Sequence, residues 1–202
     1  MLLKSLEKFK RNFSRLPGIG EKTAEKLGFY ILTEKKDFAK TLADSIIELK
    51  ENSRVCAECG NISDTDPCVF CGDLSRDNGM VCVVESALDV YYIEETDSFN
   101  GLYHILGGLI SPLNGVMPDD LRLSSLLDRI VKRNISEVII GTSPTTEGDT
   151  TALYIRSMID EKFGAHKIKV THLARGIPIG TDIQFAGKGS LSQALKNREQ
   201  VG

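Results

Sequence analysis

The sequence Cys56-Ala57-Glu58-Cys59, followed after eight residues by Cys68-Val69-Phe70-Cys71, contains four of the five cysteines of the chain. Because a two-residue gap lets both sulfurs of a tight loop reach one ion, two such pairs can surround Zn2+ with a tetrahedron of thiolates. Four thiolates leave no open position for water or substrate, so we predict a structural site with one zinc ion per chain. The predicted ligands are Cys56, Cys59, Cys68 and Cys71.

Glycines follow the second cysteine of each pair, at Gly60 and Gly72. We expect the backbone to bend past the sulfur at both positions, where a side chain would crowd the loop. The alternative interpretation is two disulfides or four free thiols. It is disfavoured because so short and polar a loop has no core of its own, and nothing else in the sequence suggests secretion.

Length and composition limit the possible classes of protein. With 202 residues, 41% of them hydrophobic, the chain can form one or two domains with a sizeable core. Charges appear as early as Lys4, too early for a signal peptide, and no apolar run approaches a membrane span. We therefore expect a cytoplasmic protein with no membrane partner. Cys82 lies in an apolar run of strand type, so we expect it to be a small buried residue.

Charge is distributed unevenly along the chain. The net charge is -3, but residues 1–40 contain 10 Lys and Arg against 5 Asp and Glu, so this part carries +5 and the remainder -8. A basic N-terminal part followed by an acidic remainder suggests that residues 1–40 bind phosphate, whereas the remainder binds protein or simply keeps the chain soluble.

A basic amphipathic helix is predicted over residues 2–15. Its apolar residues recur at spacings of 4, 3 and 4, at Leu2, Leu6, Phe9 and Phe13. Basic residues repeat that spacing two positions later, at Lys4, Lys8, Arg11 and Arg15. Two positions are about 200° of rotation, so the basic stripe faces away from the core. Such a stripe is either a solvated face or a DNA contact, and Lys8 and Arg11 are the candidates for DNA contact.

A glycine turn, Leu16-Pro17-Gly18-Ile19-Gly20, separates this helix from a second one predicted over 21–32. The glycines allow a tight turn with an open outer surface, and Ile19 can fill the gap between the helices. The free amides at the start of the second helix form an anion site. Lys22 and Lys26 project from this helix, whereas Ala24, Leu27 and Ile31 form its inner face. A dinucleotide-binding fingerprint is excluded, because the third glycine is missing and a helix precedes the turn.

The segment from Leu16 to Ala24 resembles the helix-hairpin-helix DNA-binding motif, with its hydrophobic-Pro-Gly-Ile-Gly pattern followed by Lys and Ala. The resemblance implies that backbone amides hold DNA phosphates without reading sequence, in single- and double-stranded DNA. An ordinary turn between helices is the alternative. The expected DNA-binding residues of the motif are Gly18, Ile19, Gly20, Lys22 and Lys26. A third helical pattern, at Phe38, Leu42, Ile46 and Leu49, leads into the cysteines.

Alternating strands and helices are predicted after the cysteines. We expect strands at 80–84, 137–141 and 167–173, and helices at 119–133 and from about 150 to 163. Such alternation indicates an α/β fold with a largely parallel sheet and flanking helices. Glu85 directly follows the first strand, at the sheet edge where α/β proteins place their ligands, so it is a candidate site residue.

The loop 142–149 resembles the Toprim domain of topoisomerases and primases. In that domain a glutamate after the first strand acts with an Asp-x-Asp pair and a following Glu-Gly-Glu to hold Mg2+. Glu85, Glu147 and Asp149 match this acidic site in part, but Ser143 and Thr145 replace the paired aspartates. Because Mg2+ needs anionic oxygens to offset its dehydration, we expect a degenerate site and no strand-cleavage chemistry. Solvated carboxylates in an unrelated α/β domain are the alternative.

Over nearly its whole length the chain resembles the RecR family of bacterial recombination mediators, which has the hairpin, the four cysteines and the Toprim segment in this order. Further matching runs are 101–108, 111–115 and 173–180. The segment Ala186-Gly187-Lys188-Gly189-Ser190-Leu191 departs from the family pattern by losing two acids and gaining a lysine. The implied parts are a helical region at 1–54, a zinc finger at 55–72, a Toprim domain at 79–175 and a C-terminal segment at 176–202.

The resemblance implies a binding protein without enzymatic turnover. Its expected role is to act with the RecO and RecF proteins in recombinational DNA repair, helping to load RecA on gapped single-stranded DNA at the bacterial nucleoid. It also implies a homo-oligomer, either a dimer or a ring-shaped tetramer. The alternative hypothesis is a Mg2+-dependent nuclease or topoisomerase-like enzyme that acts through Glu85 and Glu147.

Overall fold

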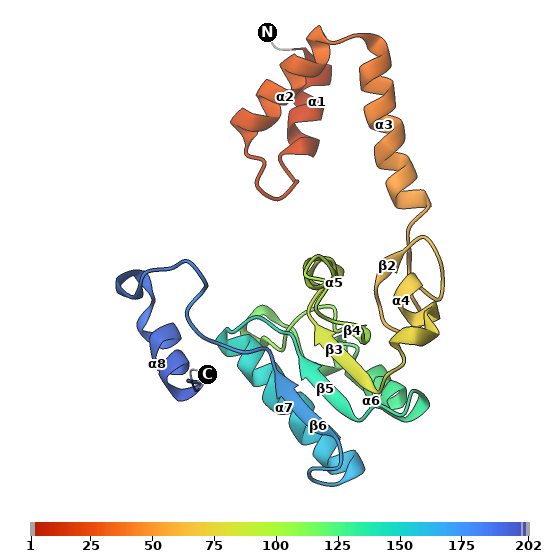
Figure 1. The fold of residues 1–202 in the computed structure, drawn as a ribbon. Helices are drawn as coiled ribbons and strands as arrows, with labels where there is room; N and C mark the ends of the chain where they lie inside the picture. The colour runs from red at the N-terminus through yellow and green to blue at the C-terminus, as the bar shows by residue number, and fades with distance from the viewer. Residues whose placement is uncertain (1–2, 199, 201–202) are drawn as a thin grey trace. The chain divides into compact units, whose positions relative to one another are not determined.

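The computed structural model describes residues 3–198 and 200, and the chain divides into two compact units, residues 1–53 and 54–202 (Figure 1). Every helix among the described residues is too short or too polar to cross a lipid bilayer.

The first unit begins with a pair of packed helices, α1 (Lys4–Phe13) and α2 (Glu21–Thr33). Leu6 and Ala24 are buried between them. Gly28 permits this close approach, because a Cβ atom there would lie 2.4 Å from Leu6 Cδ1. The predicted helical hairpin is therefore confirmed. Its first helix is shorter than predicted, and Leu2 lies outside the described residues.

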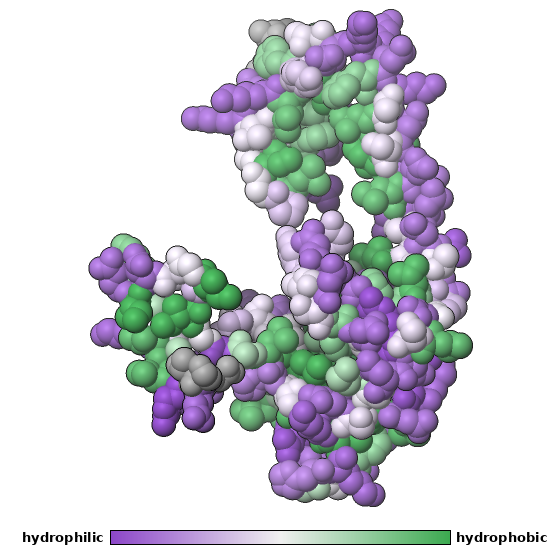
Figure 2. Space-filling model, in the orientation of Figure 1, coloured by the Kyte–Doolittle hydropathy of each residue, from purple (hydrophilic) through white to green (hydrophobic). Residues whose placement is uncertain are grey.

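The third helix, α3 (Lys36–Glu51), buries no side chain. Of its predicted apolar face, Phe38, Ile46 and Leu49 are all at least 40% exposed, whereas Leu42 is half-buried. The hydropathy colouring in Figure 2 shows hydrophobic surface over the helices of this unit. Tyr30 of α2 packs edge-on against Phe38, but no side chain of α3 is buried, so burying the rest of this stripe requires a contact outside the unit.

The second unit is built on a four-stranded parallel sheet with the strand order β4-β3-β5-β6. The strands are β3 (Met80–Val84), β4 (Leu102–Ile105), β5 (Glu137–Ile140) and β6 (Lys169–His172). Three of the four were predicted, and the α/β class with a parallel sheet is confirmed. The strand β4, whose four residues are all buried, was not predicted.

The two faces of the sheet have different covers. Alternate residues point to opposite faces, so Val81, Val83 and Leu102 pack with α6 (Leu123–Lys132) and α7 (Thr146–Phe163). Cys82, Val84, Tyr103 and Ile105 instead join one cluster with Val90 of α5 (Ala87–Glu94) and with the cysteines Cys56, Cys59, Cys68 and Cys71. The cysteine segment thus forms part of the core on the second face. Cys82 is buried, as predicted.

Short elements complete the chain. The cysteine segment contains β1 (Arg54–Val55), β2 (Ile62–Ser63) and α4 (Val69–Gly72), and β1 pairs antiparallel with β2. Single 3-10 turns lie at Leu74–Arg76, Pro112–Asn114, Pro118–Asp120 and Ile183–Phe185, and α8 (Lys188–Lys196) is the last helix of the described chain.

Two predicted helix starts were wrong. The helix expected over 119–133 is a 3-10 turn followed by α6, which starts at Leu123 because Pro118 and two aspartates favour a separate turn. The helix expected from about 150 begins at Thr146, because Thr145 caps it. Glu147 and Asp149 therefore lie in the first turn of α7 and not in a loop.

Candidate functional site

The four cysteines predicted to bind zinc lie together and are buried. Their sulfur atoms are all within 4.8 Å of one another, and Cys59 Sγ lies 3.6 Å from Cys68 Sγ. A tetrahedron with Zn–S bonds of about 2.3 Å separates its sulfurs by about 3.8 Å, so the four residues fit Zn2+. They are the only group of at least three His, Cys, Asp or Glu side chains in residues 3–198 and 200 whose ligand atoms gather closely enough to hold a metal ion.

The short distances between the four thiols also favour the binding of a cation among them. Hydrogen bonds from Cys59 and Cys71 lower the pKa of the Cys68 thiol, whereas the hydrogen bond to Cys68 raises the pKa of Cys59. Backbone amides further stabilise negative sulfur, since Asn61 N donates to Cys59 Sγ over 3.3 Å and Cys68 N donates to Cys56 Sγ over 3.4 Å. A divalent ion would allow all four thiols to ionise together.

Of the two glycines predicted to turn the loop, only Gly60 does so. Its φ is +82°, and a Cβ atom there would lie 2.8 Å from Arg122 Nε and 3.1 Å from the Ile105 carbonyl oxygen. The prediction for Gly72 was wrong. Gly72 ends the short helix α4 without a positive φ, and a Cβ atom there would meet nothing within 4 Å.

The cysteine segment is joined to the sheet at the edge strand β4. The Ile105 amide donates to the Cys59 carbonyl oxygen over 2.8 Å, and Arg122 Nη2 donates to the Ala57 carbonyl oxygen over 3.1 Å. His104 Nε2 lies 2.7 Å from the Arg122 carbonyl oxygen, and burial lowers the pKa of His104 to about 4, so its neutral ring donates there. The segment therefore covers an edge that would otherwise be open to other strands.

Ion pairs attach the same segment to α6, and the Phe70 ring links it to α5 through Arg76, which lies just after the segment. Glu58 binds Lys132 and Arg133 of the α6 end, at 2.9 and 2.7 Å. Arg76 binds Glu94 of α5 through two nitrogens, at 2.7 and 2.5 Å, and its guanidinium lies 4.9 Å from the Phe70 ring centre. The zinc ligands are thus part of one framework with the helices beside them.

The glycine turn of the first unit has the open geometry expected of an anion site. Gly18 has a φ of +77°, and a Cβ atom at Gly18 or Gly20 would meet nothing within 4 Å. Gly20 is the N-cap of α2 and provides no capping side chain, so the first amides of α2 have no acceptor within the helix. Ile19 is half-buried, consistent with a plug between the helices.

The four basic side chains predicted to bind DNA are all exposed. Lys22 and Lys26 project from α2, and Lys8 and Arg11 lie on the exposed face of α1. One acid, Glu21, also stands at the start of α2, where its carboxylate lies 3.7 Å from Lys10 Nζ. Lys10, which the sequence analysis did not select, therefore offsets the negative charge nearest to the amides.

The acidic residues that match the Toprim pattern do not form a metal cluster among the described residues. Glu85 accepts a hydrogen bond from the Ser143 amide, and Asp149 Oδ1 lies 2.5 Å from Arg175 Nη2. The hydrogen bond from Arg175 lowers the pKa of Asp149. Glu147 is exposed in the first turn of α7. Hydrogen bonds within the protein thus occupy two of the three carboxylates, those of Glu85 and Asp149.

The residues at the positions of the missing aspartates have structural roles. The Thr145 hydroxyl accepts the Gly148 amide over 3.1 Å and so caps α7, and the Ser143 carbonyl oxygen accepts the Thr145 amide over 2.8 Å. Gly148 is required beside them, because a Cβ atom there would lie 1.9 Å from the Ser143 oxygen. The loop therefore keeps its shape without the charges that Mg2+ needs.

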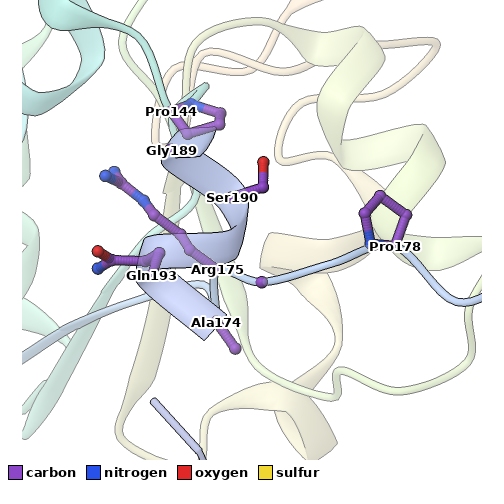
Figure 3. Close-up of a pocket in the computed structure, with 8 residues that line it drawn as sticks. Pro144, Ala174, Arg175, Pro178, Gly189, Ser190 and Gln193 are labelled. Carbon is purple, nitrogen blue, oxygen red and sulfur yellow. The ribbon is translucent and has the colours of Figure 1, made fainter. Parts of the chain in front are cut away.

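A pocket of about 570 Å³ lies at the same edge of the sheet, between the loop after β5, the segment after β6 and the start of α8 (Figure 3). Pro144, Arg175, Ser190 and Gln193 are among its lining residues. The divergent segment 186–191 contributes Gly189 and Ser190, so it forms one wall of this pocket. The charged residue in this lining is Arg175, and a guanidinium cation cannot coordinate a metal ion.

Sequence reasoning missed two arginines near these sites, Arg129 and Arg175. Arg129 is 4% exposed and lies on the buried face of α6, three residues after Leu126. A charged residue at an apolar position of an amphipathic helix is the signal that could have found it. Arg175 has no such signal, because its partner Asp149 lies 26 residues away in the sequence.

Three protein-family models match the chain, one after another. A model described as the helix-hairpin-helix of RecR matches residues 6–50, and a model described as the four-cysteine zinc finger domain of RecR matches residues 54–73. A Toprim domain model matches residues 79–174. These are the three parts, in the same order, that the sequence resemblance implied.

Removing the metal is predicted to unfold the cysteine segment and loosen the sheet edge. Structural zinc contributes on the order of 10 kcal/mol to the folding of zinc-finger peptides. We expect one zinc per chain by elemental analysis, and we expect chelation or Cys59→Ser to lower the melting temperature of the second unit. A protein that contains no zinc and melts like the untreated protein would contradict this assignment.

Proposed function

Because the chain has the three-part architecture of the RecR family and belongs to it, we propose that it is a DNA-binding recombination mediator. It acts in recombinational DNA repair with the RecO and RecF proteins and helps to load RecA on gapped single-stranded DNA. We place this activity in the cytoplasm, at the bacterial nucleoid.

The observation that carries this proposal is the open glycine turn with Lys22 and Lys26 beside it. Free amides and the dipole at the start of α2 attract a phosphate, and the two lysines add positive charge one helical turn apart. These groups contact phosphates and not base edges, so binding is independent of sequence in single- and double-stranded DNA. Lys8 and Arg11 on α1 extend the basic surface.

We assign the binding of protein partners to the exposed face of α5. Leu88, Tyr91 and Tyr92 lie on one face of this helix and are 58–61% exposed. Residues 77–121 contain eight Asp and Glu and no Lys or Arg, so this part of the chain repels phosphate. Tyrosines with carboxylates beside them suit a partner surface that offers Lys or Arg together with apolar groups.

We further propose that the protein works as a homo-oligomer, a dimer or a ring-shaped tetramer. Two groups of exposed apolar side chains support this proposal, because single chains rarely leave such groups in water. One group is on α3, with Phe38, Ile46, Ile47 and Leu49, and the other is on the C-terminal segment, with Ile179, Ile183, Phe185 and Leu195. Several glycine turns in one assembly would turn a weak contact into tight DNA binding.

We propose that the protein has no nuclease or topoisomerase activity. The pairing of Asp149 with Arg175 and the neutral Ser143 and Thr145 favour this view over the Mg2+-dependent alternative. Incubating supercoiled plasmid with the protein and Mg2+ distinguishes the two. Cleavage that disappears in Glu85→Ala would establish the enzyme instead.

Replacing both Lys22 and Lys26 by alanine is expected to lower the affinity for DNA strongly while leaving the fold and the zinc content intact. Each lost phosphate contact should flatten the plot of log affinity against log salt by roughly 0.7 to 0.9 per bound subunit. Affinity should be measured by fluorescence anisotropy at several salt concentrations, and the loss should be equal for unrelated DNA sequences.

The matched control is Lys36→Ala with Lys40→Ala, which removes the same charge from exposed positions of α3. It should bind DNA nearly as the unchanged protein does. If the Lys22 and Lys26 variant also binds unchanged, the hairpin is only a helix connection, and the DNA surface must be sought first at Lys8 and Arg11.

Replacing Tyr91 and Tyr92 by alanine is expected to weaken RecO binding at least about tenfold, because exposed aromatics carry much of the energy of protein interfaces. DNA affinity should not change. Tyr154→Ala, which removes another exposed tyrosine from α7, is the control and should bind RecO normally. Binding can be measured by calorimetry. If the variant that lacks Tyr91 and Tyr92 binds RecO as tightly as Tyr154→Ala does, α5 is not the partner surface.

A further inference from the structure

Arg129 is the buried cation closest to the zinc ligands. It lies on α6, is 4% exposed, and its Nη2 lies 2.9 Å from Cys71 Sγ. Its Nη1 donates to the Tyr103 carbonyl oxygen on the edge strand β4, over 2.5 Å. One guanidinium thus contacts a zinc ligand and the backbone of the sheet at the same time.

No carboxylate among the described residues lies within 4.0 Å of this guanidinium. The neighbouring Arg133 differs, because it is paired with Glu58 and Asp77. Arginine stays charged in proteins, and a buried charge without a partner is strongly unfavourable. The counter-charge of Arg129 must therefore be sulfur.

Four thiolates around Zn2+ carry a net charge of -2, buried in the core on the second face of the sheet. A neutral lining would leave that charge uncompensated, whereas a guanidinium at Cys71 offsets part of it and donates a charge-assisted hydrogen bond to the sulfur. Groups that hydrogen-bond to metal ligands in this way orient the ligand and tune the strength of metal binding.

We propose that Arg129 is the counter-cation of the zinc tetrathiolate and that it couples zinc binding to the edge of the sheet. With zinc bound, the charged sulfur holds the guanidinium, and the guanidinium holds the Tyr103 carbonyl group. Without the full negative charge, Arg129 loses this charged partner, and the contact to β4 weakens with it. Arg129 is a positioning residue here and not a ligand.

The test compares Arg129→Met, Arg129→Lys and Arg133→Met in the full chain. Arg133→Met is the matched control, because it removes an arginine that binds Glu58 and the Cys71 carbonyl oxygen but not the sulfur. The first measurement is the rate at which zinc passes to an excess of a chromogenic chelator. We expect at least about tenfold faster release from Arg129→Met and an intermediate rate from Arg129→Lys.

The second measurement replaces zinc by Co2+ and records the sulfur-to-metal charge-transfer band. A hydrogen bond from a cation lowers the energy of the sulfur electrons, so its loss in Arg129→Met should move the band to longer wavelength. Arg133→Met should leave the band unchanged, because a merely structural contact does not act on sulfur. If Arg129→Met does not fold, the band of Arg129→Lys decides by the same criterion.

Two results would overturn the proposal. One is an unchanged cobalt band in Arg129→Met, or in Arg129→Lys where that variant decides. The other is zinc release from Arg133→Met that is as fast as from Arg129→Met, because the effect would then come from general loosening of the segment.

Discussion

The shared contact of four thiols with one metal ion is the constraint on which the second unit depends. Cys56, Cys59, Cys68 and Cys71 are buried against Tyr103 and Ile105, so they form part of the core and not an appended loop. The Cys59 carbonyl oxygen also accepts the Ile105 amide of the edge strand. The ion therefore stabilises a segment that shares one face of the sheet with α5 and protects the edge of the sheet.

The surfaces that the proposed function requires belong to different units. The basic surface belongs to the first unit, where a glycine turn leaves helix amides free beside lysines. The acidic surface belongs to the second unit, where α5 is held by the pair Arg76 and Glu94. Arg76 also contacts Phe70 of the cysteine segment. The helix proposed to bind protein partners, α5, is therefore linked to the zinc site through Arg76.

Sequence alone predicted the elements with strong local signals. The spacing of the cysteines, the glycine turn and the runs of strand residues depend on neighbours in the chain, so the zinc ligands, the helical hairpin and three strands could be predicted. Thr145 shows the limit, because its role as a helix cap moved the start of α7 by four residues. The strand β4 is as long as β5 and β6, but it is buried on both faces and contains His104, so it shows neither alternation nor a continuous apolar run.

Contacts between residues distant in sequence could not be predicted. The pairing of Asp149 with Arg175, which takes up a carboxylate of the degenerate site, depends on how the first turn of α7 and the segment after β6 meet at one edge of the sheet. The burial of Arg129 against Cys71 joins residues 58 positions apart. The apolar stripe of α3 was predicted correctly as a helix face, but the unit that contains it does not bury it.

Hydrogen exchange of the backbone amides, with zinc bound and after its removal at neutral pH, tests most directly whether the ion stabilises the sheet. The interactions at Ile105 and Arg129 predict that zinc removal lowers protection in 102–105 and in α6, far in sequence from the cysteines, while α7 remains protected. Loss of protection confined to residues 54–73 would contradict the account, because the zinc finger would then fold and unfold independently of the sheet.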